Sequence, residues 1–305
     1  MNVRFTGIRP DGTEVILPMP VRGRYDSAED APADGLRAEF PLAKSCGTLT
    51  KLRVSGTDGS VLFFGTVDIQ REITCGTGNV LNLSCRSLAG LLLDSEAVPR
   101  TYDAPSLPVI FERHIRPYGF TSFLGSQAIC RGELCVRKGM SEWQAAAEFC
   151  RKFLRTEPRV KGMVFDASGT AAAEPLLLDN SAGMRYFRAE VRQRNCDILT
   201  KIYAPDTRTG LYRLAAEENE SITGVHRVRC LANPESDAST VLRKTERSAF
   251  SVYAECPGTP ATETGASASL RDPVLGEFAD MVVAQVRCTW DEDGIRTVYC
   301  LRRNV

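Results

Sequence analysis

The segment Asn79-Val-Leu-Asn-Leu-Ser-Cys85 alternates apolar and polar side chains. A period of two residues is typical of a β-strand that buries one of its faces. Upstream, the segments 50–55, 61–64 and 66–73 are further strand candidates, and Gly56-Thr-Asp-Gly-Ser60 supplies the residues of a tight turn. We therefore predict that residues 1–88 form a β domain, in which the Asp-, Ala-, Gly- and Pro-rich segment 22–39 is a long loop.

The next segment, residues 89–180, has the pattern of a helix-containing domain. Residues 106–115 place apolar side chains and His114 on one helical face, behind a candidate N-cap at Ser106. Ser141-Glu-Trp-Gln144 matches a capping box, in which the serine and glutamine side chains bind free backbone N–H groups. We predict a helix at each place, followed by strands at 160–165 and 175–179 that pair with each other.

Residues 181–305 return to strand patterning. We expect a helix at 237–247, and the turn Asp291-Glu-Asp-Gly294 indicates a hairpin between two long strands. Further strand candidates are 186–191, 198–204, 211–217 and 250–255. The chain is therefore predicted to be mainly β with an α/β insert, α+β overall, divided into residues 1–88, 89–180 and 181–305.

The composition is that of an ordinary globular protein of 305 residues, a length that fits two domains or three small ones. The 38 Lys and Arg balance the 38 Asp and Glu, so the formal net charge is zero. This balance argues against general nucleic-acid or anionic-membrane binding, which need a basic field, and favours self-association. Because no signal-like or bilayer-spanning apolar stretch is visible, we expect synthesis and retention in a cytosol.

Eleven scattered cysteines, an odd number, argue against a disulfide framework. Cys130 and Cys135 have a spacing found in zinc knuckles, but no second pair of ligands accompanies them. We expect a hairpin that carries these thiols, and no metal site. Cys85, Cys288 and Cys300 alternate with polar residues, which predicts small buried side chains on strands.

The sequence lacks the motifs of nucleotide-binding P-loops, hydrolase nucleophile elbows and zinc-protease helices. Gly76-Thr-Gly78 lies between strands and is predicted to be a turn. The two histidines, His114 on an apolar helix face and His226 in a strand-like context, are both expected to be packed core residues. We therefore predict no catalytic residue, no cofactor-binding residue and no cofactor.

Paired carboxylates are the remaining catalytic candidates, since a glycosidase holds two of them across a cleft. Asp94 and Glu96 follow a short apolar segment. Asp291, Glu292 and Asp293 form an acidic cluster at the predicted hairpin tip, where a solvated turn is the default. No feature of the sequence predicts a cleft next to either cluster.

Basic residues gather in three loose sets. These are Arg188, Arg192 and Arg194; Arg227 and Arg229; and Arg243, Lys244 and Arg247. The first two sets alternate along predicted strands, so we expect each to line one sheet face, as a solvated surface, a subunit interface or a channel wall. Aromatic residues are not interleaved with them in an RNA-binding pattern.

Several segments resemble baseplate hub proteins of phage tails. Two segments are similar to the junction that follows the family's first β domain. The first is Leu62-Phe-Phe-Gly-Thr-Val-Asp68. The second is residues 82–99, which begin Asn82-Leu-Ser-Cys-Arg-Ser-Leu-Ala-Gly-Leu-Leu-Leu-Asp94 and end at Pro99. Cys85-Arg86 stands where the family often has Gly-Arg. Residues 105–120 and 138–150 resemble hubs of prophage tails from Gram-positive bacteria, and 254–258 and 265–276 resemble the family's second tube-like domain.

The resemblance implies a structural protein, not an enzyme, with two tube-like β-barrel domains flanking a small helix-containing domain. Three such chains would form a ring that adapts the hexameric tail tube to a trimeric central spike in a contractile injection system. The implied location is the baseplate of a phage or R-type bacteriocin tail, assembled in the bacterial host cytoplasm. The implied partners are the tube, spike and other baseplate subunits, with the tape measure protein as a further candidate. Specific nucleic-acid binding and stable membrane insertion are not implied.

Two other functions stay open on the sequence. The β domains of a distal tail protein would bind a receptor or a sugar. A tail-associated peptidoglycan hydrolase would need acidic residues, and Asp94 and Glu96 are the best candidates for that role.

Overall fold

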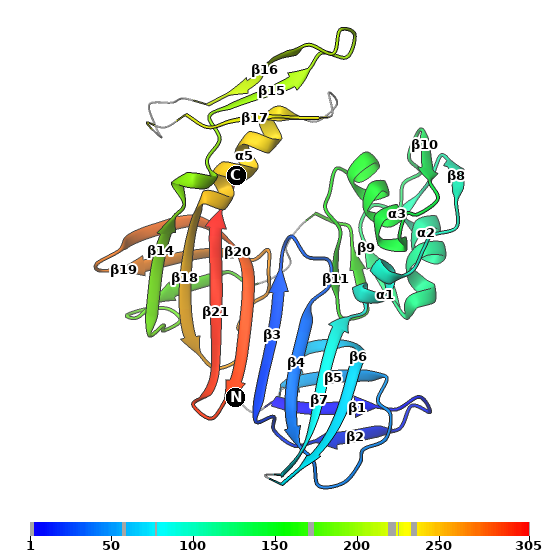
Figure 1. Ribbon diagram of the computed structural model, residues 1–305, viewed down its shortest axis with the longest axis vertical. Helices are drawn as coiled ribbons and strands as arrows, with labels where there is room; N and C mark the ends of the chain where they lie inside the picture. Colours follow the sequence, from blue (N-terminus) through cyan, green and yellow to red (C-terminus); the bar gives the residue numbers. More distant parts are fainter. Residues whose placement is uncertain are drawn as a thin grey trace. The chain divides into compact units, whose positions relative to one another are not determined.

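The computed structural model describes residues 3–56, 59–76, 78–169, 174–218, 224, 226–232 and 237–304. The chain divides into two compact units. Unit 1 comprises residues 1–172, 258–261 and 286–297, and unit 2 comprises residues 173–257, 262–285 and 298–305. Strands dominate both units and helices are few (Figure 1), which confirms the predicted mainly β class. The division into three domains stays a prediction.

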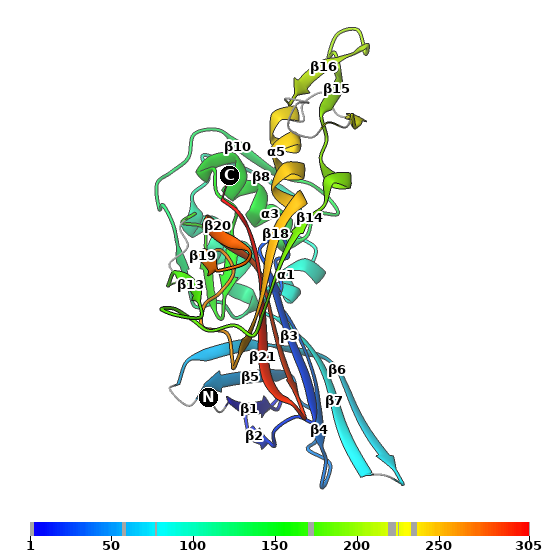
Figure 2. The same ribbon diagram turned by 90° about the vertical axis from the view of Figure 1, so that its left-hand side faces the viewer.

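Unit 1 begins with seven antiparallel strands. They are β1 (Val3–Ile8), β2 (Glu14–Leu17), β3 (Arg22–Ala28), β4 (Gly35–Pro41), β5 (Lys51–Gly56), β6 (Val61–Cys75) and β7 (Gly78–Ser87). Their order is β3-β4-β7-β6-β5-β1-β2. In Figure 1, β5, β1 and β2 run across β3, β4 and β7, and Figure 2 shows the long β6–β7 hairpin extending past its neighbours. A register shift at Val67/Ile69 in β6 accompanies this change of direction, because a bulge bends its strand.

The strands predicted at 50–55 and 79–85 are confirmed as β5 and β7, and the two predicted at 61–64 and 66–73 form one continuous strand, β6. Thr57, Asp58 and Thr77 of the predicted turns lie outside the described residues. The predicted long loop at 22–39 is wrong, because this segment forms the β3–β4 hairpin. Tyr25, Leu36 and Phe40 are buried on alternate positions of the two strands. The small and charged residues between them obscure the period of two.

The middle of unit 1 carries short helices and three small strand pairings. Its elements are α1 (Ala89–Asp94), β8 (Arg100–Asp103), α2 (Leu107–Ile110), the π-helix η1 (Phe111–Ile115), the 3-10 helix η2 (Arg116–Tyr118), β9 (Ser122–Leu124), β10 (Glu133–Val136), α3 (Glu142–Phe149), the π-helix η3 (Cys150–Leu154), β11 (Arg159–Lys161) and β12 (Val164–Asp166). Both predicted helices are confirmed, and Ser141 and Gln144 form the complete capping box. Their apolar faces bury a common core that includes Phe111 and Phe149.

The predicted pairing between 160–165 and 175–179 is wrong. Gly162 adopts a positive φ of 56° and turns the chain between β11 and β12, so these two strands pair with each other. Residues 176–179 form β13 of unit 2, which pairs in parallel with β19. This pairing joins segments about ninety residues apart, so no local pattern predicts it.

The described residues of unit 2 form two sheets and the helix α5. Its elements are β13 (Leu176–Asp179), β14 (Arg188–Gln193), the 3-10 helix η4 (Asn195–Asp197), β15 (Lys201–Pro205), β16 (Tyr212–Glu217), β17 (Val228–Cys230), α5 (Ala238–Ala249), β18 (Phe250–Pro257), β19 (Ser267–Asp272), and parts of β20 (Gly276–Asp291) and β21 (Gly294–Arg303). The predicted helix at 237–247 is confirmed as α5, whose N-cap Asp237 accepts two backbone N–H bonds. The predicted hairpin around 291–294 is confirmed by the neighbouring strands β20 and β21.

Within the described residues, no helix is both long and apolar enough to cross a membrane.

Candidate functional site

Arg86, at the end of β7, organises the junction between the strands and the helices of unit 1. Its Nε atom donates to Asp68 Oδ2 on β6 at 2.5 Å. Its two Nη atoms donate to the Asp94 carboxylate at the end of α1, at 3.1 and 2.5 Å. The bonds from Arg86 hold the pKa of Asp94 below its usual value, and the two carboxylates raise the pKa of Arg86. The guanidinium therefore ties two strands to the first helix.

Gly65 on β6 allows the backbone of β7 to approach closely at this junction. A Cβ atom at position 65 would lie 2.0 Å from the carbonyl oxygen of Arg86. A Cβ on Gly90 of α1 would lie 3.1 Å from the Cβ atom of Arg86. The junction therefore requires glycine on the strand and leaves little room for a side chain on the helix.

The acidic candidates Asp94 and Glu96 both take part in contacts that hold unit 1 together. Asp94 pairs with Arg86, and Glu96 Oε1 accepts a 2.9 Å hydrogen bond from the backbone N–H of Gly139. The second acidic cluster lies at the β20–β21 turn, where Asp291 accepts a 2.6 Å bond from Arg296 and the Asp293 side chain is 76% exposed. Neither arrangement supports the hydrolase alternative.

His114 is a hydrogen-bonded core residue, as predicted. Its Nδ1 atom lies 2.5 Å from Glu142 Oε2, and its Nε2 atom lies 2.8 Å from the hydroxyl of Tyr102. The hydroxyl of Tyr118 donates to the other Glu142 oxygen at 3.1 Å. Both ring nitrogens of His114 therefore have a buried hydrogen-bond partner. Glu142 appears in the sequence only as a first-turn helix residue, because its partners lie 24 or more positions away.

The prediction for His226 is wrong, because this residue is exposed and lies in no strand.

Arg188 and Arg192 do share a face of β14, but Glu190 lies between them and pairs with both, at 3.0 and 2.7 Å. That face is therefore balanced in charge. Of the other members of the basic sets, Arg229 lies on β17, Arg227 precedes that strand, and Arg194 follows β14 and pairs with Asp197. Arg243, Lys244 and Arg247 lie on α5.

All eleven cysteines are free thiols. Cys85, Cys288 and Cys300 are buried on strands as predicted, and burial raises the pKa of Cys85 and of Cys288 to about 12. The predicted hairpin at Cys130 and Cys135 is wrong, because Cys130 lies in a loop and Cys135 belongs to β10, which pairs with β8. In the part of the chain that the structure describes, no three His, Cys, Asp or Glu side chains are grouped to hold a metal ion.

Unit 2 exposes an apolar sheet face. The strands β16, β15 and β17 pack Ile202 against Leu242 of α5 on one side. On β16, Tyr212 and Leu214 are 51% and 49% exposed, and Val228 on β17 is 54% exposed. Their exposure indicates a surface suited to contact with another protein.

Unit 1 offers a second candidate contact at β2. This strand pairs with β1 and ends the strand order among the described residues, and Ile16 on it is exposed. An edge strand presents backbone N–H and C=O groups that another strand can pair with. Both candidate contacts depend on strand order, which the sequence pattern does not reveal.

The sequence matches no protein-family model and no curated protein. The fold, in contrast, matches solved structures along the whole chain. A tail protein from Neisseria meningitidis superposes with a TM-score of 0.74 at 16% identity, and the match covers 100% of this chain and 97% of that one. The 43 kDa tail protein of prophage MuSo2 from Shewanella oneidensis superposes with a TM-score of 0.73 at 14% identity, with 99% and 98% covered.

The chain has the fold of these two tail proteins. The same fold extends to an E. coli component of the type VI secretion system that is itself similar to the T4 bacteriophage tail proteins gp27 and gp5. That match has a TM-score of 0.58 at 9% identity and covers 100% of this chain and 77% of the other. The resemblance to hub-like tail proteins is therefore confirmed at the level of the fold.

Proposed function

We propose that this protein is a structural subunit of the baseplate hub of a phage-like contractile tail. Three copies form a ring that adapts the hexameric tail tube to the trimeric central spike. The observation that carries the proposal is the full-length match of the fold to two tail proteins, one of them from a prophage. The match to a type VI secretion component similar to gp27 and gp5 adds support for a position next to a spike.

The proposed role is structural, with tube-like β domains that pack against other subunits. The exposed edge of β2 and the apolar face around Leu214 are the surfaces that we assign to such contacts. The proposed partners are further copies of this chain, the tube and spike subunits and neighbouring baseplate proteins. The proposed location is the tail baseplate of a phage or bacteriocin particle.

Mass measurement of the purified chain and imaging of tail particles that carry a label on it test this proposal together. We expect three copies per ring, and label at the tube end that bears the spike. A chain that is strictly monomeric and absent from tail particles contradicts the proposal. Peptidoglycan zymography gives an independent check, because lysis that is abolished by Asp94→Asn or Glu96→Gln would show a hydrolase instead.

A further inference from the structure

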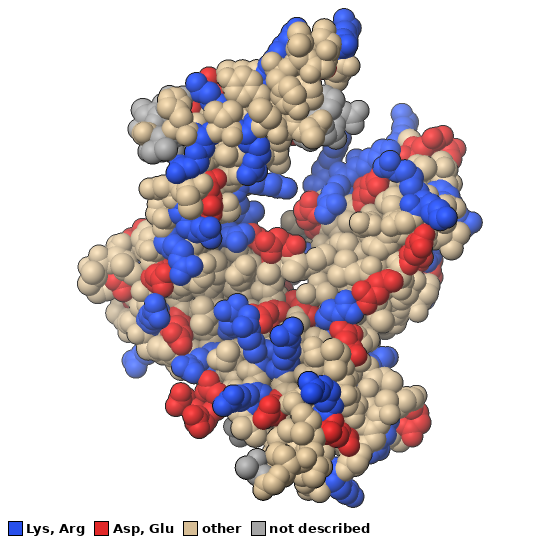
Figure 3. Space-filling view, in the orientation of Figure 1, with Lys and Arg blue, Asp and Glu red and all other residues tan. Residues whose placement is uncertain are grey.

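A basic groove of about 750 Å³ lies beside α3 in unit 1. It lies between the turn that precedes this helix and the outer face of α3 and η3. Its lining residues are Arg137, Lys138, Gly139, Met140, Gln144, Glu148, Arg151 and Lys152. Four cations thus accompany one carboxylate, and Figure 3 shows Lys and Arg gathered over the surface near β10 and α3. The proposed structural role in a tail does not involve this groove.

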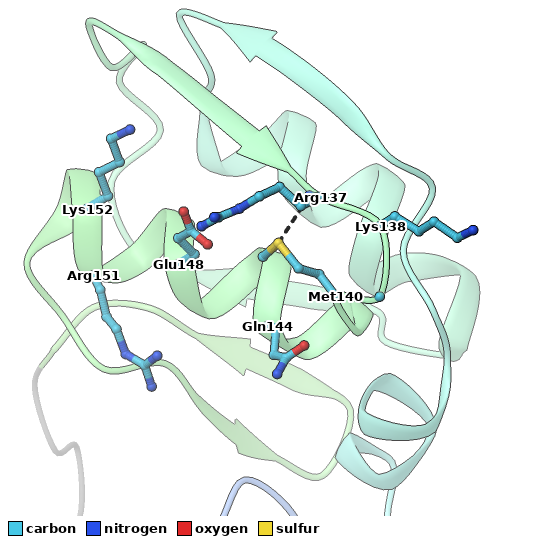
Figure 4. A pocket seen from close by; sticks show the side chains of 8 residues that line it. Arg137, Lys138, Met140, Gln144, Glu148, Arg151 and Lys152 are labelled. Carbon is cyan, nitrogen blue, oxygen red and sulfur yellow. Dashed lines mark hydrogen bonds between the residues drawn. The ribbon is translucent and has the colours of Figure 1, made fainter. Parts of the chain in front are cut away.

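The turn that carries two of the cations is held from several sides. Met140 N–H donates to Arg137 O at 3.2 Å, and Arg137 N–H donates to the Met140 sulfur at 3.2 Å (Figure 4). Glu96 accepts from Gly139 N–H at 2.9 Å, and Met140 O accepts from Ala97 N–H at 2.8 Å. The turn is therefore ordered before any ligand arrives, which lowers the entropic cost of binding.

Two of the four cations that line the groove already bind other residues of the chain, and two form no ion pair within the described residues. Arg151 is paired with Glu157 at 2.9 Å, and Lys152 Nζ donates to the backbone oxygen of Glu133 at 2.6 Å. Arg137 and Lys138 form no ion pair with any described residue. Figure 4 shows Arg137 extending across the groove toward Glu148 while Lys138 points outward. These two cations remain available for an anionic partner.

The chemistry of the groove favours a peptide over a nucleic acid. No aromatic side chain lines it, whereas single-stranded nucleic acids are usually held by stacking on aromatic rings. The Glu148 carboxylate on the helix wall can accept hydrogen bonds from backbone N–H groups, which a peptide carries and a phosphate backbone lacks. We propose that the groove binds an acidic segment of a partner protein, with its carboxylates on Arg137 and Lys138 and its backbone N–H groups facing Glu148.

The test is fluorescence anisotropy of the purified full chain with a dye-labelled peptide rich in Asp and Glu. Comparison probes are the same peptide with Asn and Gln, and an oligothymidylate of equal charge. We expect the acidic peptide to bind more tightly than either comparison probe. Its affinity should fall about tenfold or more in the double variant Arg137→Glu/Lys138→Glu, and fall with added salt.

The control variant Arg4→Glu/Lys44→Glu makes the same change in net charge at two exposed residues of unit 1 outside the groove. We expect it to bind the acidic peptide within about twofold of the wild type, since distant surface charges are screened. Equal losses in both double variants, or no binding by the wild type, overturn the proposal. Tighter binding of the oligothymidylate also overturns it, in favour of a nucleic-acid surface. Because these measurements need no tail particle, their failure is distinguishable from failure of the tail role.

Discussion

At the scale of single residues, Arg86 is the side chain on which the junction of unit 1 depends. It lies in the segment that resembles tail hub proteins, and it binds Asp68 on a strand and Asp94 on a helix. A lysine cannot replace it, because an ammonium lacks the planar fork that engages both oxygens of a carboxylate. The contribution of the Arg86–Asp94 pair to the free energy of unfolding of unit 1 depends on pH.

We expect Asp94→Asn to lower the free energy of unfolding of unit 1 by about 0.5–1 kcal/mol at neutral pH, since the pair is partly exposed. The folded pKa of Asp94 lies below that of the unfolded chain, so its contribution is complete above about pH 4 and is lost as the pH falls through the folded pKa. Wild type and variant should therefore converge in acid. Urea unfolding followed by tryptophan fluorescence measures this, because both tryptophans, Trp143 and Trp290, belong to unit 1.

Asp30→Asn is the matched control, because Asp30 is exposed on the β3–β4 turn and has no ion pair among the described residues. It should leave the unfolding free energy nearly unchanged at every pH. A difference between wild type and Asp94→Asn that stays constant into acid would contradict the assigned role of Asp94.

At the scale of elements, the two predicted helices of unit 1 begin in different ways. The side chain of Ser141 accepts the N–H of Gln144, whose own side chain accepts the N–H of Ser141. Ser106 occupies the same position before α2, but its side chain forms no capping hydrogen bond. The same residue type at the same helix position thus satisfies a free N–H group in one case only.

Replacing each serine by alanine separates these two cases. We expect Ser141→Ala to lower the unfolding free energy of unit 1 by about 1 kcal/mol, because it leaves an N-terminal N–H group of α3 without its partner. Ser106→Ala should cost less than about 0.5 kcal/mol, since it removes no capping bond. The urea midpoint by tryptophan fluorescence measures both, and equal losses would show that the capping bond does not stabilise α3.

At the scale of the whole molecule, the thiols divide by burial. Cys75, Cys135, Cys196 and Cys230 are exposed, whereas six other cysteines are buried and Cys130 is intermediate. Burial keeps the inner thiols out of contact with reagents, and it raises the pKa of Cys150 and of Cys256 to about 12. Cys230 is paired in register with Tyr203 in the small sheet of unit 2, so it lies close to the candidate contact face.

Titration with a disulfide reagent should therefore show four fast thiols in the native isolated chain, and all eleven after denaturation. If the face that includes Leu214 is buried between subunits, the assembled form should lose the fast reaction of Cys230. Mass mapping of the labelled cysteines identifies which ones react. Fast labelling of Cys85 or Cys288 in the native chain would contradict the fold described for their strands.

Local patterns predicted the elements whose signals are local. The alternation at 79–85, the capping box at Ser141 and the turn at 291–294 all correspond to observed elements. Predictions that needed a distant partner were less successful. Residues 176–179 pair with a strand far along the chain and not with 160–165. The loop assigned to 22–39 is a local hairpin, and it was missed because small and charged residues obscure its alternation. Side chains outside the predicted candidates, such as Asp68 and Glu142, acquired their roles through contacts with distant residues.

The sequence by itself determined the mainly β class, the places of the helices, the buried state of His114 and the resemblance to tail hub proteins. The strands, the helices and the burial of His114 follow from the period of hydrophobic residues and from capping chemistry, which act over a few residues. The resemblance rests on short segments and on the order in which they occur along the chain. Only the tertiary structure decided that Asp94 and Glu96 serve the junction and the turn, and that a basic groove forms beside α3. The physical reason is that a carboxylate becomes an anchor or a catalyst according to the groups that folding brings within hydrogen-bond distance.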